Sequence, residues 1–167
     1  LNGLLDAGVN FIDTAACYGR SEKQIGQSIS RRRSEYYLAT KAGHVVGGAT
    51  GEEYSEQVIS ESIDRSLKRL NTDVLDLVQI HSCSAEVLRR GEAANALVRA
   101  KKDGKTRYIG FSGDGDAAAE SIGMGVFDTL QTSFNVVDQS AADEILPMAM
   151  ARGMGIIAKR PIANAAF

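Results

Sequence analysis

The run VLDLVQIH, residues 74–81, decides the fold. It is apolar apart from Asp76, Gln79 and His81, and its length and composition predict a strand. The segment before it has the three- and four-residue spacing of apolar side chains that predicts a helix, at Val58, Ile59, Ile63, Leu67 and Leu70. A helix that leads into an apolar strand is one unit of an alternating α/β fold.

The same alternation extends in both directions from this run. Besides Val74–His81, strands are predicted at Val9–Asp13, Tyr36–Lys41, Tyr108–Ser112, Thr129–Asn135 and Ile156–Lys159. Helices are predicted between them, from capping-box patterns at Ser21–Gln24 and Thr50–Glu53 and over Val87–Val98, Ala117–Ile122 and Ala141–Arg152. Strands that alternate with helices in this way imply right-handed crossovers and a parallel sheet.

Two parallel architectures are compatible with this pattern. An open sheet that binds a dinucleotide carries G-x-G-x-x-G directly after its first strand, and the glycines at 43, 47, 48 and 51 do not give that spacing. The predicted fold class is therefore α/β, of the (β/α)8 TIM-barrel type. A closed barrel usually needs about 250 residues, so the 167 residues are expected to form six βα units, with two strands missing. Residues 1–167 are interpreted as a single domain truncated at both ends, because the chain opens on Leu1 inside a predicted helix.

Composition excludes several classes of protein. The net charge is −2 and the basic residues are not gathered on one segment, which argues against nucleic acid as a partner. No apolar run approaches the roughly 18–20 residues that span a membrane. Cys17 and Cys83 are too few for a disulfide scaffold and lack metal-ligand spacing, so a cytoplasmic protein without a metal is expected. The oligomeric state is left open.

Four reactive side chains fall at the carboxyl ends of predicted strands or in the loops that follow them. Asp13, Lys41 and His81 end three successive strands, and Tyr18 lies in the loop after the first. Barrel enzymes place their reactive groups at this end of the strands, and successive strand ends are neighbours around the barrel. These four side chains are therefore predicted to converge at one mouth.

The chemistry expected of this set follows from the pKa of its tyrosine. A free tyrosine, with a pKa of about 10, is a poor acid–base group near neutrality. The ammonium of Lys41 would stabilise the phenolate of Tyr18 and lower that pKa, and the Asp13 carboxylate would hold the ammonium in place. With His81 orienting a carbonyl oxygen, the set would suit reduction of a carbonyl by a hydride from elsewhere.

The motifs around these residues closely resemble those of the aldo-keto reductase family. The resemblance is carried by GVNFIDTA at residues 8–15 with Tyr18-Gly19 and Ser21-Glu22, by Thr40-Lys41, and by SLKRL at 66–70 with DVLDLVQIH at 73–81. It runs in order along nearly the whole chain, and it implies that the visible strands are the family's second to seventh. It further implies catalytic roles for Asp13, Tyr18, Lys41 and His81, and a small-molecule carbonyl substrate.

The resemblance also implies a nicotinamide cofactor, NADPH, with NADH not excluded because the family grips the adenosine 2′-phosphate around the eighth strand. Ser112 and Gln131 match the side chains beside the nicotinamide carboxamide, and Gly113 stands where the family usually carries Asn. Lys159 stands where many members place an aromatic side chain that stacks on the nicotinamide, although its aliphatic stem could pack there. The implied cofactor-binding residues are Asp13, Ser112, Gly113, Gln131, Lys159, Arg160, Pro161, Ile162 and Asn164.

Other interpretations remain beside the reductase. A non-catalytic, cofactor-binding or regulatory protein could use the same scaffold, since a fold alone does not fix function. A barrel lyase could use Lys41 as a Schiff-base amine. His44 is interpreted as a loop residue, and Cys17 either lines the substrate pocket or is a neutral small apolar group.

Overall fold

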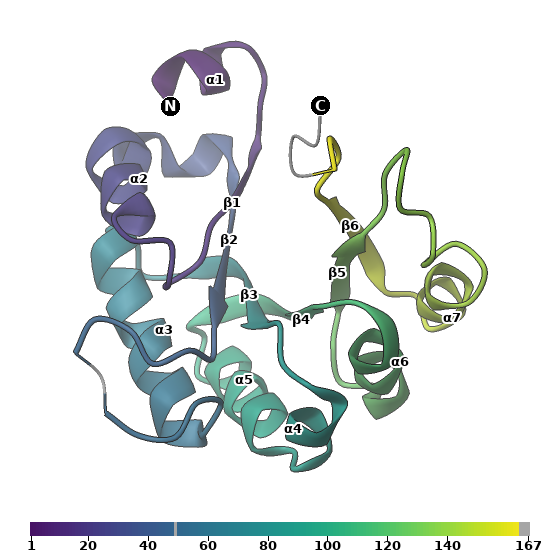
Figure 1. Ribbon diagram of the computed structural model, residues 1–167. Coiled ribbons are helices and arrows are strands. Elements are labelled where there is room, and N and C mark those ends of the chain that lie inside the picture. The colour runs from purple at the N-terminus through teal and green to yellow at the C-terminus, as the bar shows by residue number, and fades with distance from the viewer. Residues whose placement is uncertain (49, 164–167) are drawn as a thin grey trace.

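The computed structural model describes residues 1–48 and 50–163. Its six strands are all parallel and lie in sequence order, so that each strand pairs with the next one along the chain. Together they form a curled half-barrel (Figure 1), which confirms the predicted incomplete (β/α)8 architecture. The strands are β1 (Phe11–Asp13), β2 (Tyr37–Ala42), β3 (Leu75–His81), β4 (Thr106–Ser112), β5 (Thr129–Ser133) and β6 (Gly155–Lys159).

Helices connect the strands and cover the outer side of the curled sheet (Figure 1). The apolar layer beneath them includes Leu38, Val78, Ile80, Phe111 and Leu130, each 0% exposed. This layer supplies the hydrophobic free energy that holds helices and sheet together. The helices are α1 (Asn2–Asp6), α2 (Ser21–Ile29), the 3-10 helix η1 (Ser30–Glu35), α3 (Glu56–Leu70), α4 (Ala85–Arg89), α5 (Glu92–Lys102), α6 (Gly115–Met124) and α7 (Ile145–Ala151).

The register of the sheet places the predicted site residues side by side at the carboxyl ends of the strands. Lys41 pairs with Gln79, and His81 pairs with Ser112, which in turn pairs with Gln131. Because all strands run in the same direction, these residues line one rim at the carboxyl ends of the strands. None of the described helices is both long enough and apolar enough to cross a membrane.

Of the two helix starts predicted from capping boxes, the one at Ser21 is confirmed and the one at Thr50 is wrong. Helix α3 begins at Glu56, and its cap is Ser55, whose hydroxyl accepts a hydrogen bond from the Val58 N–H at 3.3 Å. Helix α2 does begin at Ser21, but the Ser21 hydroxyl accepts a hydrogen bond from Thr14 Oγ1 at 2.8 Å instead of capping the helix. In each case the serine hydroxyl hydrogen-bonds to a group that folding brings close to it. The spacing of residues in the sequence does not identify that group.

Turn residues account for two other differences in element boundaries. The helix predicted over Val87–Val98 is two helices, α4 and α5, because Gly91 adopts a left-handed φ of 78° between them. Strand β5 ends at Ser133, before the predicted Asn135, because the Asn135 side chain accepts hydrogen bonds from the N–H groups of Val137 and Asp138 and starts a turn.

Candidate active site

A buried ion pair joins the first two strands at the rim. The ammonium of Lys41 lies 2.6 Å from Asp13 Oδ2 and donates to the carbonyl of Thr14 at 3.0 Å. Its side chain is only 2% exposed, whereas that of Asp13 is 31% exposed. Gln79 Nε2 donates to the other Asp13 oxygen at 3.4 Å. A buried lysine is rare without a partner, and the surrounding acceptors compensate its charge.

Tyr18 lies in the loop after β1 and closes over this pair. The ammonium of Lys41 lies 5.4 Å from the centre of its ring, and the ring meets His81 edge-on at 5.7 Å between centroids. The pKa of Tyr18 is raised, because partial burial disfavours the phenolate and the charge of Asp13 opposes it. This differs from the expectation that Lys41 lowers the pKa, since the ammonium is already paired with Asp13. Tyr18 is therefore a protonated phenol at neutral pH.

His81 ends β3 and faces the loop that carries Tyr18. Its Nδ1 lies 3.3 Å from the sulfur of Cys17. Burial lowers the pKa of His81 to about 4, and the nearby ammonium groups of Lys41 and Lys159 add to that effect. The imidazole is therefore neutral near pH 7 and carries one N–H donor.

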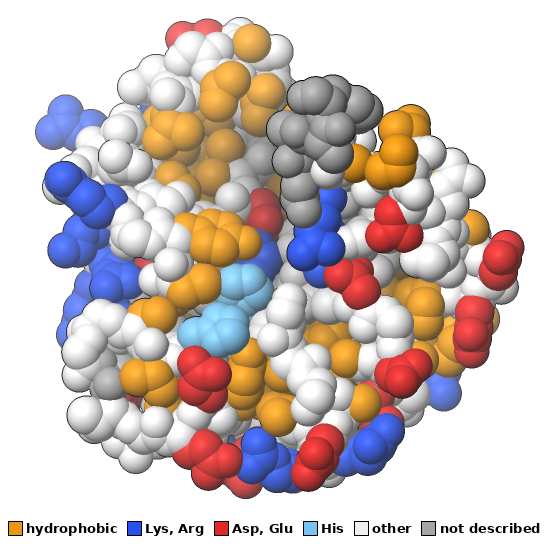
Figure 2. All heavy atoms as spheres, viewed as in Figure 1, with side chains coloured by type: hydrophobic (Ala, Val, Ile, Leu, Met, Phe, Trp, Pro, Cys, Tyr) orange, Lys and Arg blue, Asp and Glu red, His pale blue; other side chains and the backbone are white. Residues whose placement is uncertain are grey.

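His44 is a member of this cluster that the sequence did not identify. It follows β2 by two residues, and its ring lies 5.0 Å from that of His81. Tyr54 packs edge-on against it at 5.5 Å, and the Tyr54 hydroxyl donates to the carbonyl of Ser82 at 3.0 Å. Figure 2 shows the chain's two histidines side by side on the surface. Its position three residues after Lys41, at the carboxyl end of the same strand, could have indicated that His44 lies at the rim.

The residues implied to hold the nicotinamide lie on the neighbouring strands. The Ser112 hydroxyl donates to Gln131 Oε1 at 2.8 Å, and both side chains are buried. The Gly113 N–H donates to the carbonyl of Gln131 at 3.0 Å. A Cβ on Gly113 would lie 2.5 Å from the ring of Phe111, so the absence of a side chain here has a steric cause.

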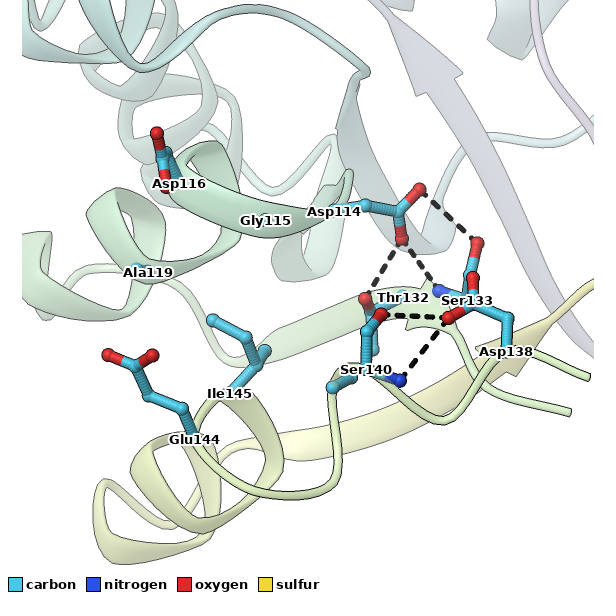
Figure 3. Close-up of a pocket in the computed structure, with 11 residues that line it drawn as sticks. Asp114, Gly115, Asp116, Ala119, Thr132, Ser133, Asp138, Ser140, Glu144 and Ile145 are labelled. Atoms are coloured by element: carbon cyan, nitrogen blue, oxygen red, sulfur yellow. Dashed lines mark hydrogen bonds between the residues drawn. The ribbon is translucent and has the colours of Figure 1, made fainter.

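Asp114, after β4, forms ion pairs with two cations at the end of the rim. It is a second site residue that the sequence did not identify. Its carboxylate accepts from the Ser133 N–H at 2.7 Å and from Thr132 Oγ1 at 3.0 Å (Figure 3). It also pairs with Lys159 at 3.1 Å and Arg160 at 3.5 Å. Burial acts to raise the pKa of Asp114, but these donors outweigh it, and the pKa is lowered. Asp114 therefore holds both cations beside the end of β6.

The pocket that Asp114 borders is not suited to a phosphate. It lies between the start of α6 and the loop before α7, and Figure 3 shows its lining side chains. Four of them are carboxylates, which would repel an anion: Asp114, Asp116, Asp138 and Glu144.

The last implied cofactor residues follow β6. Arg160 has a left-handed φ of 57°, and its carbonyl accepts from the Ala163 N–H at 2.9 Å. The resulting turn carries Pro161 and Ile162, and Ile162 is 60% exposed. Asn164 lies outside the described residues.

Comparison with known proteins identifies the family of the chain. The model of the Aldo/keto reductase family matches residues 1–167. The chain belongs to this family. L-galactose dehydrogenase from Arabidopsis thaliana is 32% identical over 93% of the chain and 52% of its own length. NADH-specific methylglyoxal reductase from Escherichia coli is 28% identical over 93% of the chain and 53% of its own length.

Solved aldo-keto reductases share the fold. The holo form of an aldo-keto reductase from Bacillus halodurans superimposes with a TM-score of 0.88 at 26% identity, over 98% of this chain and 56% of that one. The chain thus spans about half the length of the curated relatives it matches.

Proposed function

We propose that the protein is an NAD(P)H-dependent oxidoreductase that reduces an aldehyde or ketone to an alcohol, with Tyr18 as the proton donor. The observation that carries the proposal is the junction of four reactive side chains at one rim. Lys41 lies 2.6 Å from Asp13, and Tyr18 lies against both Lys41 and His81. In the full-length protein, the family's first and eighth strands would complete the barrel around this rim.

The side chains on β4 to β6 fit a nicotinamide cofactor. The hydroxyl of Ser112 and the amide of Gln131 have the donors and acceptors that a carboxamide needs. Arg160, 48% exposed, presents a guanidinium suited to a phosphate. Lys159, Gly113, Pro161, Ile162 and Asn164 complete the proposed set with Asp13. When bound, the cofactor supplies a hydride. NADPH is the proposed form, and NADH remains an alternative that the binding experiment below separates.

Each residue has one task in the proposed reaction. Neutral His81 donates its N–H to the carbonyl oxygen and orients it. As the carbonyl carbon gains a hydride, the oxygen takes a proton from the Tyr18 hydroxyl. The ammonium of Lys41 stabilises the phenolate that this transfer leaves, and Asp13 holds the ammonium.

The same ion pair argues against the lyase alternative. An amine that forms a Schiff base must be neutral and free to attack, whereas Lys41 is buried against Asp13. A non-catalytic protein on this scaffold would bind the cofactor without turnover, which the next experiment tests.

The test compares Tyr18→Phe with Tyr37→Phe, a change at an exposed tyrosine on β2. General acid catalysis contributes about 10²–10⁴-fold, so Tyr18→Phe should lower kcat for an aldehyde by that factor. The Kd for NADPH and for NADH, from a fluorescence titration, should not change. Tyr37→Phe should leave both quantities as they are. Wild-type turnover by Tyr18→Phe would overturn the proposed mechanism, and cofactor binding without any wild-type turnover would favour the non-catalytic alternative.

A further inference from the structure

Cys17 makes a contact with His81 that the proposed chemistry does not use. Its sulfur lies 3.3 Å from Nδ1 of His81, within the range of a sulfur hydrogen bond. Over residues 1–48 and 50–163, this is the one hydrogen bond of the His81 ring. Burial raises the pKa of the Cys17 thiol, and the thiol therefore keeps its proton at neutral pH. The contact thus joins a neutral thiol to a neutral imidazole.

The direction of this hydrogen bond decides where the imidazole proton lies. A neutral imidazole has one N–H donor and one bare nitrogen that is a good acceptor, whereas a thiol sulfur is only a weak acceptor. The favoured arrangement is therefore an S–H of Cys17 that donates to a bare Nδ1 of His81. The ring proton then lies on Nε2, the nitrogen left free for a carbonyl oxygen.

His44 constrains the same ring from another side. The two imidazoles meet at an interplanar angle of 69°, with 5.0 Å between their centroids. His44 Nδ1 lies 3.2 Å from Glu53 Oε1, and the ring packs against Tyr54. Tyr54 can approach because Gly43 has no side chain, since a Cβ there would lie 2.5 Å from the Tyr54 ring. The position of His44 is thus fixed by the loop that follows β2.

We infer that Cys17 and His44 are positioning residues that hold His81 as the Nε2–H tautomer with its ring aimed at the substrate carbonyl. The inference rests on the proposed function for its catalytic consequence, but the tautomer itself is a property of the chain alone. The S–H of Cys17 donates a hydrogen bond to Nδ1, which favours the tautomer with the ring proton on Nε2. His44 restricts the rotation of the ring.

Nitrogen NMR of the imidazoles tests the tautomer directly. The chain has two histidines, so His44→Gln leaves one signal set and assigns His81. At pH 7 the wild type should show His81 with its proton on Nε2. In Cys17→Ser the hydroxyl can accept as well as donate, so this variant should show more of the Nδ1–H tautomer than the wild type. Cys17→Ala lacks the donor and should shift His81 towards a mixture of both tautomers. An unchanged tautomer in Cys17→Ala, in a variant that keeps the wild-type Tm, would overturn the inference.

Kinetics of the full-length protein test the consequence for the reaction. Cys17→Ala should lower kcat about tenfold, the size expected for one neutral hydrogen bond, and leave the Kd of NADPH unchanged. Cys17→Ser, whose hydroxyl can also accept from an Nδ1–H, should have a kcat between those of Cys17→Ala and the wild type. A changed tautomer with an unchanged kcat would overturn the positioning role.

His44 is tested by the difference between two variants. His44→Phe keeps a ring against His81 and should keep most of the rate, whereas His44→Ala should lower kcat. Equal rates in the two variants would contradict a role in orienting the ring. If the wild type reduces no carbonyl at all, the proposed function fails, and the NMR comparison still decides whether Cys17 sets the tautomer.

Discussion

The two halves of the rim differ in how far their paired charges are exposed to solvent. In the half built on β1 to β3, the ammonium of Lys41 is buried, 2% exposed, and has Asp13 beside it. In the half built on β4 to β6, Asp114 and Arg160 are 42% and 48% exposed, and one carboxylate holds two cations. The cation of the first half is thus almost fully buried, whereas of the two cations in the second half Lys159 is 15% exposed and Arg160 is half-exposed.

This difference indicates what each half is suited for. Separating a buried pair leaves an uncompensated charge away from water, so the geometry around Lys41 is fixed before any ligand binds. An exposed cation paired with a partly exposed carboxylate interacts weakly in water, so Arg160 can turn from Asp114 to an anionic ligand at little cost. The strands β1 to β3 thus carry reactive groups whose geometry is preformed, and the neighbouring strands carry a cation that can change its partner.

The largest expected effect comes from breaking one ion pair in each half. Asp13→Asn leaves the buried charge of Lys41 without its counter-charge and should lower the free energy of unfolding by about 3 kcal/mol. Asp114→Asn removes a partly exposed charge and should cost about 1 kcal/mol. Urea denaturation at pH 7 measures both. Equal costs would mean that the two halves do not differ as described.

Two glycines in matching places give the next comparison. Gly43 follows β2 and Gly113 follows β4, and a Cβ on either would meet an aromatic ring at 2.5 Å. Gly43 also has a φ of 138°, which strains any other residue. Both alanine variants should lose about 1–3 kcal/mol of stability, with the larger loss for Gly43→Ala. Thermal unfolding tests this order, and a larger loss for Gly113→Ala would contradict it.

The pH dependence of stability should report His81. Its pKa is about 4 in the folded chain, below the ordinary value of 6.5. The unfolded state therefore binds the extra proton first as the pH falls. The folded state loses stability between pH 6.5 and 4, at no more than about 1.4 kcal/mol per pH unit. Below pH 4 this contribution is constant again. His81→Gln should flatten that part of the stability curve, and an unchanged slope would show that other groups cause it.

The smallest expected effect concerns how helices begin in the two halves. Helix α3 is capped by the Ser55 side chain, whereas Asp114, at the start of α6, makes no capping bond because its carboxylate serves Ser133 and Lys159. Ser55→Ala should cost about 1 kcal/mol, as for other lost caps. Thr50→Ala, at the start predicted from sequence, should cost close to nothing. Thermal melting followed by circular dichroism compares the two variants. Equal losses of stability would contradict Ser55 as the cap of α3.

The order of elements and the rim were predictable because each depends on local pattern. Apolar runs with helices between them allow few topologies, and parallel strands bring their carboxyl ends together without further information. Asp13, Lys41 and His81 could thus be placed at one rim from strand ends alone. Family motifs then singled out Tyr18 in the loop.

The pairing of Lys41 with Asp13 was expected, but the other partners of these residues could not be predicted, because they depend on distances between loops. Nothing in the spacing places Cys17 against Nδ1 of His81 or His44 against the same ring. Asp114 could not be singled out from the sequence, because only the pairing of β6 with β5 brings Lys159 and Arg160 to it. The raised pKa of Tyr18 was missed for a similar reason, since the charge of Lys41 is taken up by Asp13.

The strict sequence order of the strands also has a consequence in time. Each of the strands β2 to β6 pairs with the strand made just before it, so none of these five must wait for a partner made later. Asp13, Tyr18, Lys41 and His81 all lie on the first three strands or the loop after the first, within the first 81 of the 167 residues. During synthesis the reactive groups can therefore come together while the ribosome is still adding the strands proposed to hold the cofactor.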